Sequence, residues 1–271
     1  MSAARPFTPP FVAVGVDGSR AAVRAAVWAI DEALSHDVPL RLMWVDDDAH
    51  ADPLPQAVDA VTACGRGVRV QTETLTGEPT AALVAASGSA AMICVGAAGL
   101  KHGDEHRIGS TAAALVAAAH CPVAVVRGAE HTGGWIVAGL DETPDSAAVL
   151  QTAVAQARLR GAPLKVLGSW QSRYSDAADA AAVSDGNRMV RAQLDRRLEE
   201  WRSRYPDLDV EPVTVHGDVL DYLTAHSASV QLVVIGARND ADVTQLLGPA
   251  GLAALHDTDC SVLVVDRQRL L

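Results

Sequence analysis

Positive charge is scarce in this chain. Among its 271 residues, 22 are lysine or arginine and 33 are aspartate or glutamate, so the formal net charge is −11 and the isoelectric point lies near 5.2. Proteins that bind nucleic acids or anionic membranes generally do so through basic surfaces. The composition therefore indicates no nucleic-acid partner and no membrane partner, although local basic pockets are compatible with it.

Long apolar runs and cysteine pairs are missing as well. No apolar run approaches the length of about 20 residues that spans a bilayer, and the N-terminus lacks the apolar region of a signal peptide. We therefore expect a cytoplasmic protein. The four cysteines, Cys64, Cys94, Cys121 and Cys260, form no Cys-x-x-Cys pair, which favours buried thiols over redox or zinc chemistry.

Catalytic motifs are also absent. The sequence contains no Gly-x4-Gly-Lys-Ser/Thr loop and no Gly-x-Ser-x-Gly elbow, and no residues can be assigned as the nucleophile of a phosphoryl transfer. We expect no enzyme, or at most a weak ATPase. The acids of residues 46–52, with His50, would suit a divalent cation, but an acidic run after a strand is usually a solvated loop, so no metal site is expected there.

What the chain does contain is an internal repeat. Val-Gly-Val-Asp-Gly-Ser at residues 14–19 returns at 137–143 as Val-Ala-Gly-Leu-Asp-Glu-Thr, and the two copies stay in register over their length. The offset is 124 residues from Asp17 to Asp141 and 140 residues from Gly77 to Gly217. The second copy therefore carries an insertion between about 170 and 205, in which residues 172–186 are predicted to form a mobile surface loop.

The repeat predicts two domains, each long enough to bury its own core. We expect a flexible N-terminus at 1–10, a first domain at 11–127, a linker at 128–134, a second domain at 135–266 and a C-terminal tail at 267–271. The linker is short, polar and rich in glycine, which suits two copies that pack together.

The hydrophobic pattern of the first copy predicts an α/β fold. Apolar runs at 11–16, 40–45, 92–96 and 123–126 are typical of strands buried on both faces, and the alternating run 68–75 is typical of an edge strand. Helices are predicted at 19–35 and 111–119. In the first of them Ser19 is the expected cap, and the apolar stripe is expected at Val23, Val27, Ile30 and Leu34.

Alternation of strands and helices predicts a doubly wound, five-stranded parallel sheet in each copy, with the order 3-2-1-4-5. Ligands bind such sheets beyond the carboxyl ends of the strands where the order reverses, here between strands 1 and 4. Strand 1 ends at Asp17 and strand 4 ends at Gly96, so both are expected at this crevice.

A glycine-spaced loop follows strand 4 of the first copy. It reads Gly96-Ala97-Ala98-Gly99, nine residues, then Gly109-Ser110-Thr111 at the start of a helix. Glycines let the backbone N–H groups approach a polyphosphate, and a helix N-terminus binds anions. Lys101 and Arg107 would add charged donors, which the nearby Asp104 and Glu105 partly offset.

This spacing, with Val-Gly-Val-Asp-Gly-Ser before it and Ala-His-Cys-Pro-Val-Ala-Val-Val after it, resembles the ATP-binding branch of the universal stress protein family over both copies. The resemblance implies an adenine-nucleotide alpha-hydrolase-like fold and a pseudo-dimer formed through the fifth strands, 123–126 and 262–265. It also implies an ATP site, at which Mg²⁺ that accompanies the ATP could lie near Asp17. The residues implied or predicted to form that site are Gly15, Asp17, Val45, Gly96, Ala97, Gly99, Lys101, Arg107, Gly109, Ser110 and Thr111.

The second copy departs from this pattern. Asn239 replaces the second glycine, the spacer is one residue shorter, and Pro249 replaces the serine and so removes an amide and a hydroxyl donor. We expect only a weak or empty second site. Its residues would be Gly139, Asp141, Gly236 and Gly248.

The leading hypothesis is a sensor whose occupancy by ATP sets its interaction with an unidentified protein partner in stress response or growth control. AMP, ADP and cAMP are alternative ligands. A slow ATPase on the same site and a structural module that binds no nucleotide are alternative functions. The protein is expected to act as a homo-oligomer, most simply a dimer, or as an intramolecular pseudo-dimer.

Overall fold

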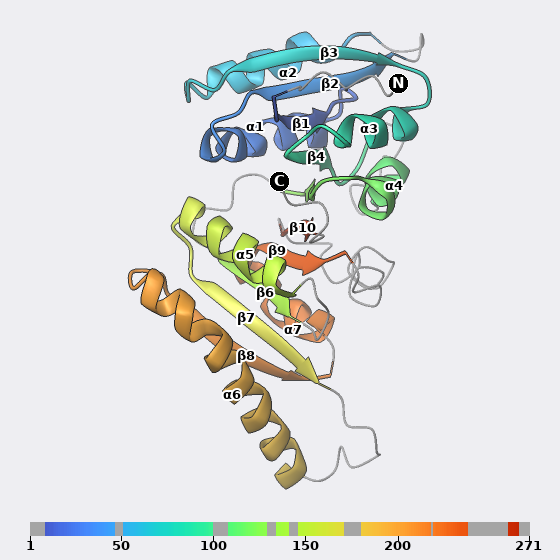
Figure 1. The fold of residues 1–271 in the computed structure, drawn as a ribbon. Helices are drawn as coiled ribbons and strands as arrows, with labels where there is room; N and C mark the ends of the chain where they lie inside the picture. The colour runs from blue at the N-terminus through green and yellow to red at the C-terminus, as the bar shows by residue number, and fades with distance from the viewer. Residues whose placement is uncertain are drawn as a thin grey trace, which may run out of the picture. The chain divides into compact units, whose positions relative to one another are not determined.

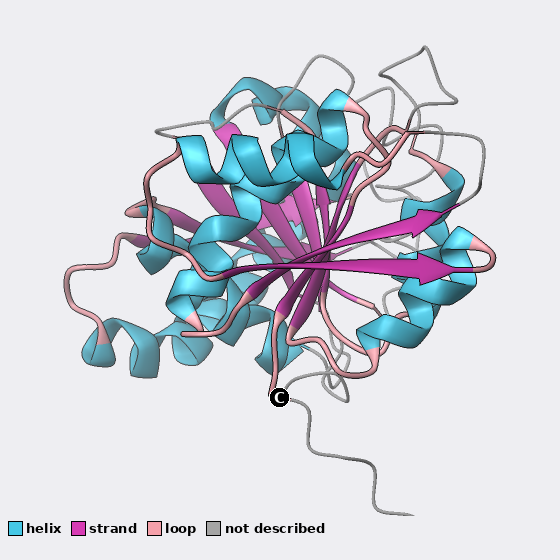
Figure 2. Ribbon diagram, turned by 90° about the horizontal axis from the view of Figure 1, so that it is seen from above, coloured by secondary structure: helices cyan, strands magenta, loops and turns pink. Residues whose placement is uncertain are grey.

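The chain divides into two compact α/β units, with the division between Val126 and Arg127 (Figure 1). The computed structural model describes residues 9–46, 51–99, 108–128, 134–140, 146–170, 180–217, 219–237 and 260–265. Within each unit, helices flank a parallel sheet, and a helix lies in each described connection between its successive strands (Figure 2). The predicted α/β class with two tandem copies is therefore confirmed.

The first unit holds five parallel strands in the order β3-β2-β1-β4-β5, the order expected from the sequence. The order reverses between β1 and β4, which lie side by side. Its elements are β1 (Val12–Gly15), α1 (Arg20–Ser35), β2 (Leu40–Asp46), α2 (Leu54–Ala63), β3 (Val70–Thr76), α3 (Pro79–Ser87), β4 (Met92–Gly96), α4 (Ser110–Ala118) and β5 (Val123–Val126).

The buried face of α1 differs from the predicted one. Ser19 caps the helix as expected, since its Oγ accepts the Ala22 N–H at 3.1 Å. The buried face, however, is built mainly from alanines, whereas Leu34 is 40 % exposed. Small side chains let a helix lie close to a sheet, so the alanine face packs inward and the predicted valine and leucine positions lie at its border. Of the predicted stripe, only Ile30 is buried.

The second unit repeats the arrangement with the order β10-β9-β6-β7-β8. Its elements are β6 (Trp135–Leu140), α5 (Ser146–Arg160), β7 (Leu164–Trp170), α6 (Ala180–Arg204), β8 (Val210–His216), α7 (Val219–His226), a 3-10 turn (Ser227–Ser229), β9 (Val230–Gly236) and β10 (Ser261–Val265).

The described part of the insertion is helical, which corrects the predicted loop over residues 180–186. Residues 180–186 are the first turns of the long helix α6, and residues 171–179 lie outside the described part of the chain. Gly186 has no room for a Cβ because the Trp170 ring lies against it, and the Trp170 indole donates to Asn187 Oδ1 at 2.8 Å. This contact fixes the start of α6 at the end of β7.

The cysteines follow the expectation with one exception. Cys94, Cys121 and Cys260 are buried, whereas Cys64, the residue that follows α2, is exposed. Burial raises the pKa of the Cys260 thiol to about 12. A thiol with such a pKa stays protonated and unreactive near neutral pH.

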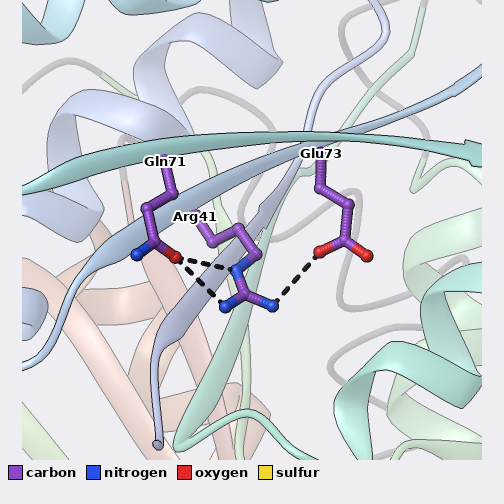
Figure 3. A network of polar contacts seen from close by, with 3 residues as sticks. All are labelled: Arg41, Gln71 and Glu73. Carbon is purple, nitrogen blue, oxygen red and sulfur yellow. Dashed lines mark hydrogen bonds and ion pairs between the residues drawn. The ribbon is translucent and has the colours of Figure 1, made fainter. Parts of the chain in front are cut away.

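In each unit, a cation on the second strand contacts an aromatic ring and the neighbouring third strand. Arg41 on β2 donates to Gln71 and Glu73 of β3 at 3.1 and 3.2 Å (Figure 3). The Arg41 Cζ also lies 3.7 Å from the centroid of the Phe11 ring. In the second unit, at matched positions, Lys165 Nζ lies 4.0 Å from the Trp135 ring centroid and 2.6 Å from Glu211 Oε2. The arrangement has therefore been kept while the residue types changed.

We expect Arg41→Ala to lower the free energy of unfolding by about 1 to 2 kcal/mol, because it removes both a cation–π contact and a partly buried ion pair. Urea denaturation measures this change. Arg69→Ala is the matched control, since the ion pair between Arg69 and Asp37 is exposed and should contribute less than about 0.5 kcal/mol. Equal losses in the two variants would contradict the structural role of Arg41.

Candidate functional site

A crevice of about 300 Å³ lies in the first unit where the strand order reverses. It is bordered by the carboxyl ends of β1, β2 and β4 and by the first residues of α1, α3 and α4. The predicted residues that line it are Gly15, Asp17, Val45, Gly96, Gly99, Gly109, Ser110 and Thr111. Lys101 and Arg107 lie outside the described residues.

Asp17 is held at the start of α1. Its Oδ1 accepts the Ser19 N–H at 2.9 Å, and Gly18 between them has φ +85°, a conformation that favours glycine. A Cβ at Gly99 would lie 2.7 Å from Asp17 Oδ2. Glycine at position 99 therefore lets the loop after β4 pass directly beside the carboxylate.

At position 96, glycine is required by the packing of α1 against β4. A Cβ there would lie 2.6 to 2.8 Å from the backbone and Cβ of Ala21, so α1 crosses the end of β4 at a distance that only glycine permits. The resemblance stated above implied that Gly96 contacts the nucleotide. In the structure its glycine identity is explained by helix packing, although it also borders the crevice.

Ala97 positions the next helix. Its N–H donates to the Val126 carbonyl at 2.8 Å, and its carbonyl accepts the Gly109 N–H at 2.8 Å. Ala97 is 7 % exposed and is not among the residues that border the crevice. It therefore fixes Gly109 at the start of α4, with its own amide already used.

Three helices begin at the crevice, and their first amides are used differently. Ser19 caps α1, and the Glu78 carboxylate caps α3 by accepting the Thr80 and Ala81 N–H groups at 3.0 and 2.7 Å. The residue before α4 is Gly109, which has no side chain, and no side chain of the described residues caps this helix. Amides in the first turn of a helix lack partners within the helix, so α4 offers donors for an anion.

The start of α3 was not recognised from the sequence as part of the site. Glu78, Pro79, Thr80 and Leu83 border the crevice, as do Met43 and Trp44 at the end of β2. The connection from β3 at the sheet edge to β4 must pass the ends of β2 and β1, which brings α3 over the crevice. The signal was Gly77-Glu78-Pro79, a turn followed by proline at the first helical position.

The charged side chains that border the crevice are carboxylates. Among the described residues that line it, Asp17 and Glu78 are acidic and none is lysine, arginine or histidine. Hydrogen bonds from the Ala81 and Thr80 amides hold the pKa of the exposed Glu78 carboxyl below its ordinary value of 4.5. Among the described residues of the crevice, helix amides and hydroxyl groups are therefore the donors available to an anion.

The other predicted sites are described only in part. Gly139 and Gly236 are buried near the ends of β6 and β9, while Asp141, Gly248, Asn239 and Pro249 lie outside the described residues. Of the acidic run after β2, Asp46 and Asp52 are described, and Asp52 caps the Leu54 amide at 2.8 Å. In the part of the chain that the structure covers, no three His, Cys, Asp or Glu side chains group as metal ligands.

We expect Gly96→Ala to destabilise the protein by about 1 to 3 kcal/mol, because its methyl group would overlap Ala21. Gly109→Ala is the control, since the nearest atoms to its Cβ would be 3.8 Å away and the cost should stay below about 1 kcal/mol. Denaturant unfolding compares the two. Similar stabilities would show that α1 and β4 are not closely packed at Gly96.

Glu78→Gln should remove a contribution to stability that depends on pH. Because the folded-state pKa of Glu78 is depressed, its charge stabilises the protein above pH 4.5, and this contribution is lost as pH falls through the folded-state value. The variant should melt at a lower temperature than the wild type at pH 7, and the gap should close under acidic conditions. Melting curves over a pH series test this; a constant gap would count against the cap.

Comparison with known families gives two matches along the chain. The universal stress protein family matches residues 12–127 and again residues 135–266. Universal stress protein Rv2028c of Mycobacterium tuberculosis is 41 % identical, covering 97 % of this chain and 98 % of the relative. Universal stress protein Rv2624c of the same organism is 37 % identical, covering 94 % of this chain and 96 % of the relative.

Solved structures share the fold. A universal stress protein from Archaeoglobus fulgidus aligns with a TM-score of 0.65 at 15 % identity, over 96 % of this chain and 97 % of that chain. A putative universal stress protein from Pseudomonas aeruginosa aligns with a TM-score of 0.64 at 18 % identity, over 95 % and 93 %. Across the described residues, no helix has the length and apolar character to cross a membrane.

Proposed function

The chain belongs to the universal stress protein family, and from that premise we propose that the crevice of its first domain binds ATP or a related adenine nucleotide. Occupancy of this crevice would be the signal that the protein passes to a partner. The observation that carries the proposal is the uncapped start of α4, which faces a cavity at the reversal point of the sheet.

The apolar part of the crevice supports binding of the adenosine moiety. Val16, Met43, Val45 and Leu83 are at most 8 % exposed and border the cavity. A volume near 300 Å³ is at the lower end for small-ligand sites and suits a nucleoside. The adenine ring would rest against this wall, and the Asp17 carboxylate borders the same cavity.

The capping of the helices indicates how a bound nucleotide would be oriented. The Glu78 carboxylate occupies the first amides of α3 and would repel phosphate there, whereas α4 begins with Ser110 and Thr111 and has no side-chain cap among the described residues. The phosphates would therefore extend from Asp17 past Gly99 towards α4. Because Asp17 and Glu78 add negative charge, we expect Mg²⁺ to accompany a triphosphate and to offset this repulsion.

A binding role is favoured over catalysis. Phosphoryl transfer requires a group that positions the nucleophile and cations that stabilise the developing charge. The described wall of the crevice supplies carboxylates and amides but no described lysine, arginine or histidine. We therefore retain hydrolysis only as a slow side reaction.

Ser110→Pro is the sharpest test, because Pro249 is the matched residue of the second copy. Gly109 has an extended ψ of 151°, which suits the residue before a proline, and Ser110 is the first residue of α4, where proline is tolerated. The variant should fold and lose one amide donor and one hydroxyl. We expect its affinity for MgATP, measured by titration calorimetry, to fall about tenfold or more, with adenosine binding unchanged.

Two controls complete the experiment. Ser110→Ala keeps the amide and should lose less affinity than Ser110→Pro, while Asp141→Ala in the second copy should leave the stoichiometry at about one nucleotide per chain. AMP, ADP and cAMP titrated in parallel identify the preferred ligand. Absence of binding at millimolar MgATP, or equal binding by Ser110→Pro, would refute the proposal.

A further inference from the structure

A second cavity lies in the second domain, at the amino edge of its sheet and away from the edge where the crevice would lie in this copy. It has a volume of about 430 Å³ and is bordered by the end of α5, the start of β7, the end of α6 and the segment that leads into β8. The connections at the amino ends of the strands therefore form this cavity. The proposed nucleotide site of the first domain lies at the opposite, carboxyl ends of its strands.

An aromatic stack fixes a guanidinium at this cavity. The Cζ of Arg158 lies 4.2 Å from the centroid of the Tyr205 ring, and the Cζ of Arg204 lies 5.5 Å from the same centroid. The Trp201 and Tyr205 rings are stacked at 6.2 Å with an interplanar angle of 19°. A guanidinium that stacks through its face keeps its in-plane N–H groups available to an oxyanion.

These arginines lack the acidic partners that basic residues have at the same edge of the first domain. There, Arg66 pairs with Asp31 and Arg69 with Asp37. Arg158 and Arg204 form no ion pair within the described residues, and Asp31 and Asp37 correspond to Ala155 and Gly161 in the second copy. Two cations are thus left beside one cavity in a chain of net charge −11.

The stack itself is specific to the second copy. At the offset of 124 residues Arg158 corresponds to Leu34, and at the offset of 140 residues Tyr205 corresponds to Gly65. The long helix α6 places Trp201 and Tyr205 at its end, whereas the shorter α2 ends before Gly65. The first domain therefore provides a natural comparison that lacks the stack.

Two acids complete the lining of the cavity. Asp207 and Asp209 border it together with the two arginines. A ligand that carries only negative charge would be repelled by these carboxylates, whereas hydroxyl groups would donate hydrogen bonds to them. The combination suits a molecule with a phosphate group at one end and hydroxyl groups at the other.

We propose that this cavity is a second ligand site, in which Arg158 and Arg204 bind the phosphate of a small sugar phosphate and Asp207 and Asp209 accept its hydroxyl groups. Tyr205 positions Arg158 through the stack. The site does not depend on the nucleotide crevice of the first domain.

Ribose 5-phosphate is the test probe, with inorganic phosphate and free ribose as its two halves. Titration calorimetry on the full chain should show tighter binding of ribose 5-phosphate than of either half. Arg158→Leu, the residue of the first copy, should weaken this binding about tenfold or more, because one charge-assisted contact is lost. Tyr205→Leu should weaken it less, since both arginines remain.

The Ser110→Pro variant separates this site from the proposed nucleotide site. Binding of ribose 5-phosphate that survives Ser110→Pro and is lost in Arg158→Leu supports the second site, whatever the outcome for ATP. Binding that is lost in Ser110→Pro and kept in Arg158→Leu belongs to the first domain and overturns the proposal, as does absence of binding. Melting curves of both Arg158→Leu and Tyr205→Leu check that the domain remains folded. Arg204→Gln is a further variant, and it should lower the affinity for ribose 5-phosphate about tenfold.

Discussion

The close approach of α1 to the end of β4 is the constraint on which the candidate site depends. At Gly96 the helix backbone lies where a Cβ would otherwise be, so the chain leaving β1 and the chain leaving β4 are held next to each other. The strand order reverses there, and the two connections diverge to serve β2 on one side and β5 on the other. The crevice is the space that this divergence leaves.

Once that contact is set, the backbone determines which groups face the crevice. The hydrogen bond between Gly109 and Ala97 fixes where α4 begins, and Gly99 allows the loop to pass the Asp17 carboxylate. Side-chain caps at α1 and α3 use the amides of those helices, which leaves α4 as the helix start without a side-chain cap. Polarity in the crevice thus arises from which helix ends are capped, more than from charged side chains placed in it.

The sequence was sufficient to predict the strands because residues buried on both faces of a parallel sheet form short apolar runs, as 92–96 and 123–126 do. It also identified Ser19 as the cap of α1, because capping depends on a hydrogen bond between residues that are close together in the chain. It did not predict the alanine face of α1, because alanine carries little hydrophobic signal and its burial depends on how closely the sheet approaches. Glu78 was missed because its place in the site follows from the crossover between β3 and β4, a long-range property of the topology.

Duplication makes the two copies informative about each other. Both copies have a cation on their second strand, Arg41 on β2 and Lys165 on β7, and each cation contacts an aromatic ring and an acid. Other matched positions of the two copies carry side chains of different chemistry. Leu34 and Gly65 of the first copy carry no charge. The matched residues of the second copy, Arg158 and Tyr205, border a cavity that also has charged side chains. The strands of the two copies pair in the same order, so such substitutions change the residues at one edge of the sheet and leave the strand order unchanged.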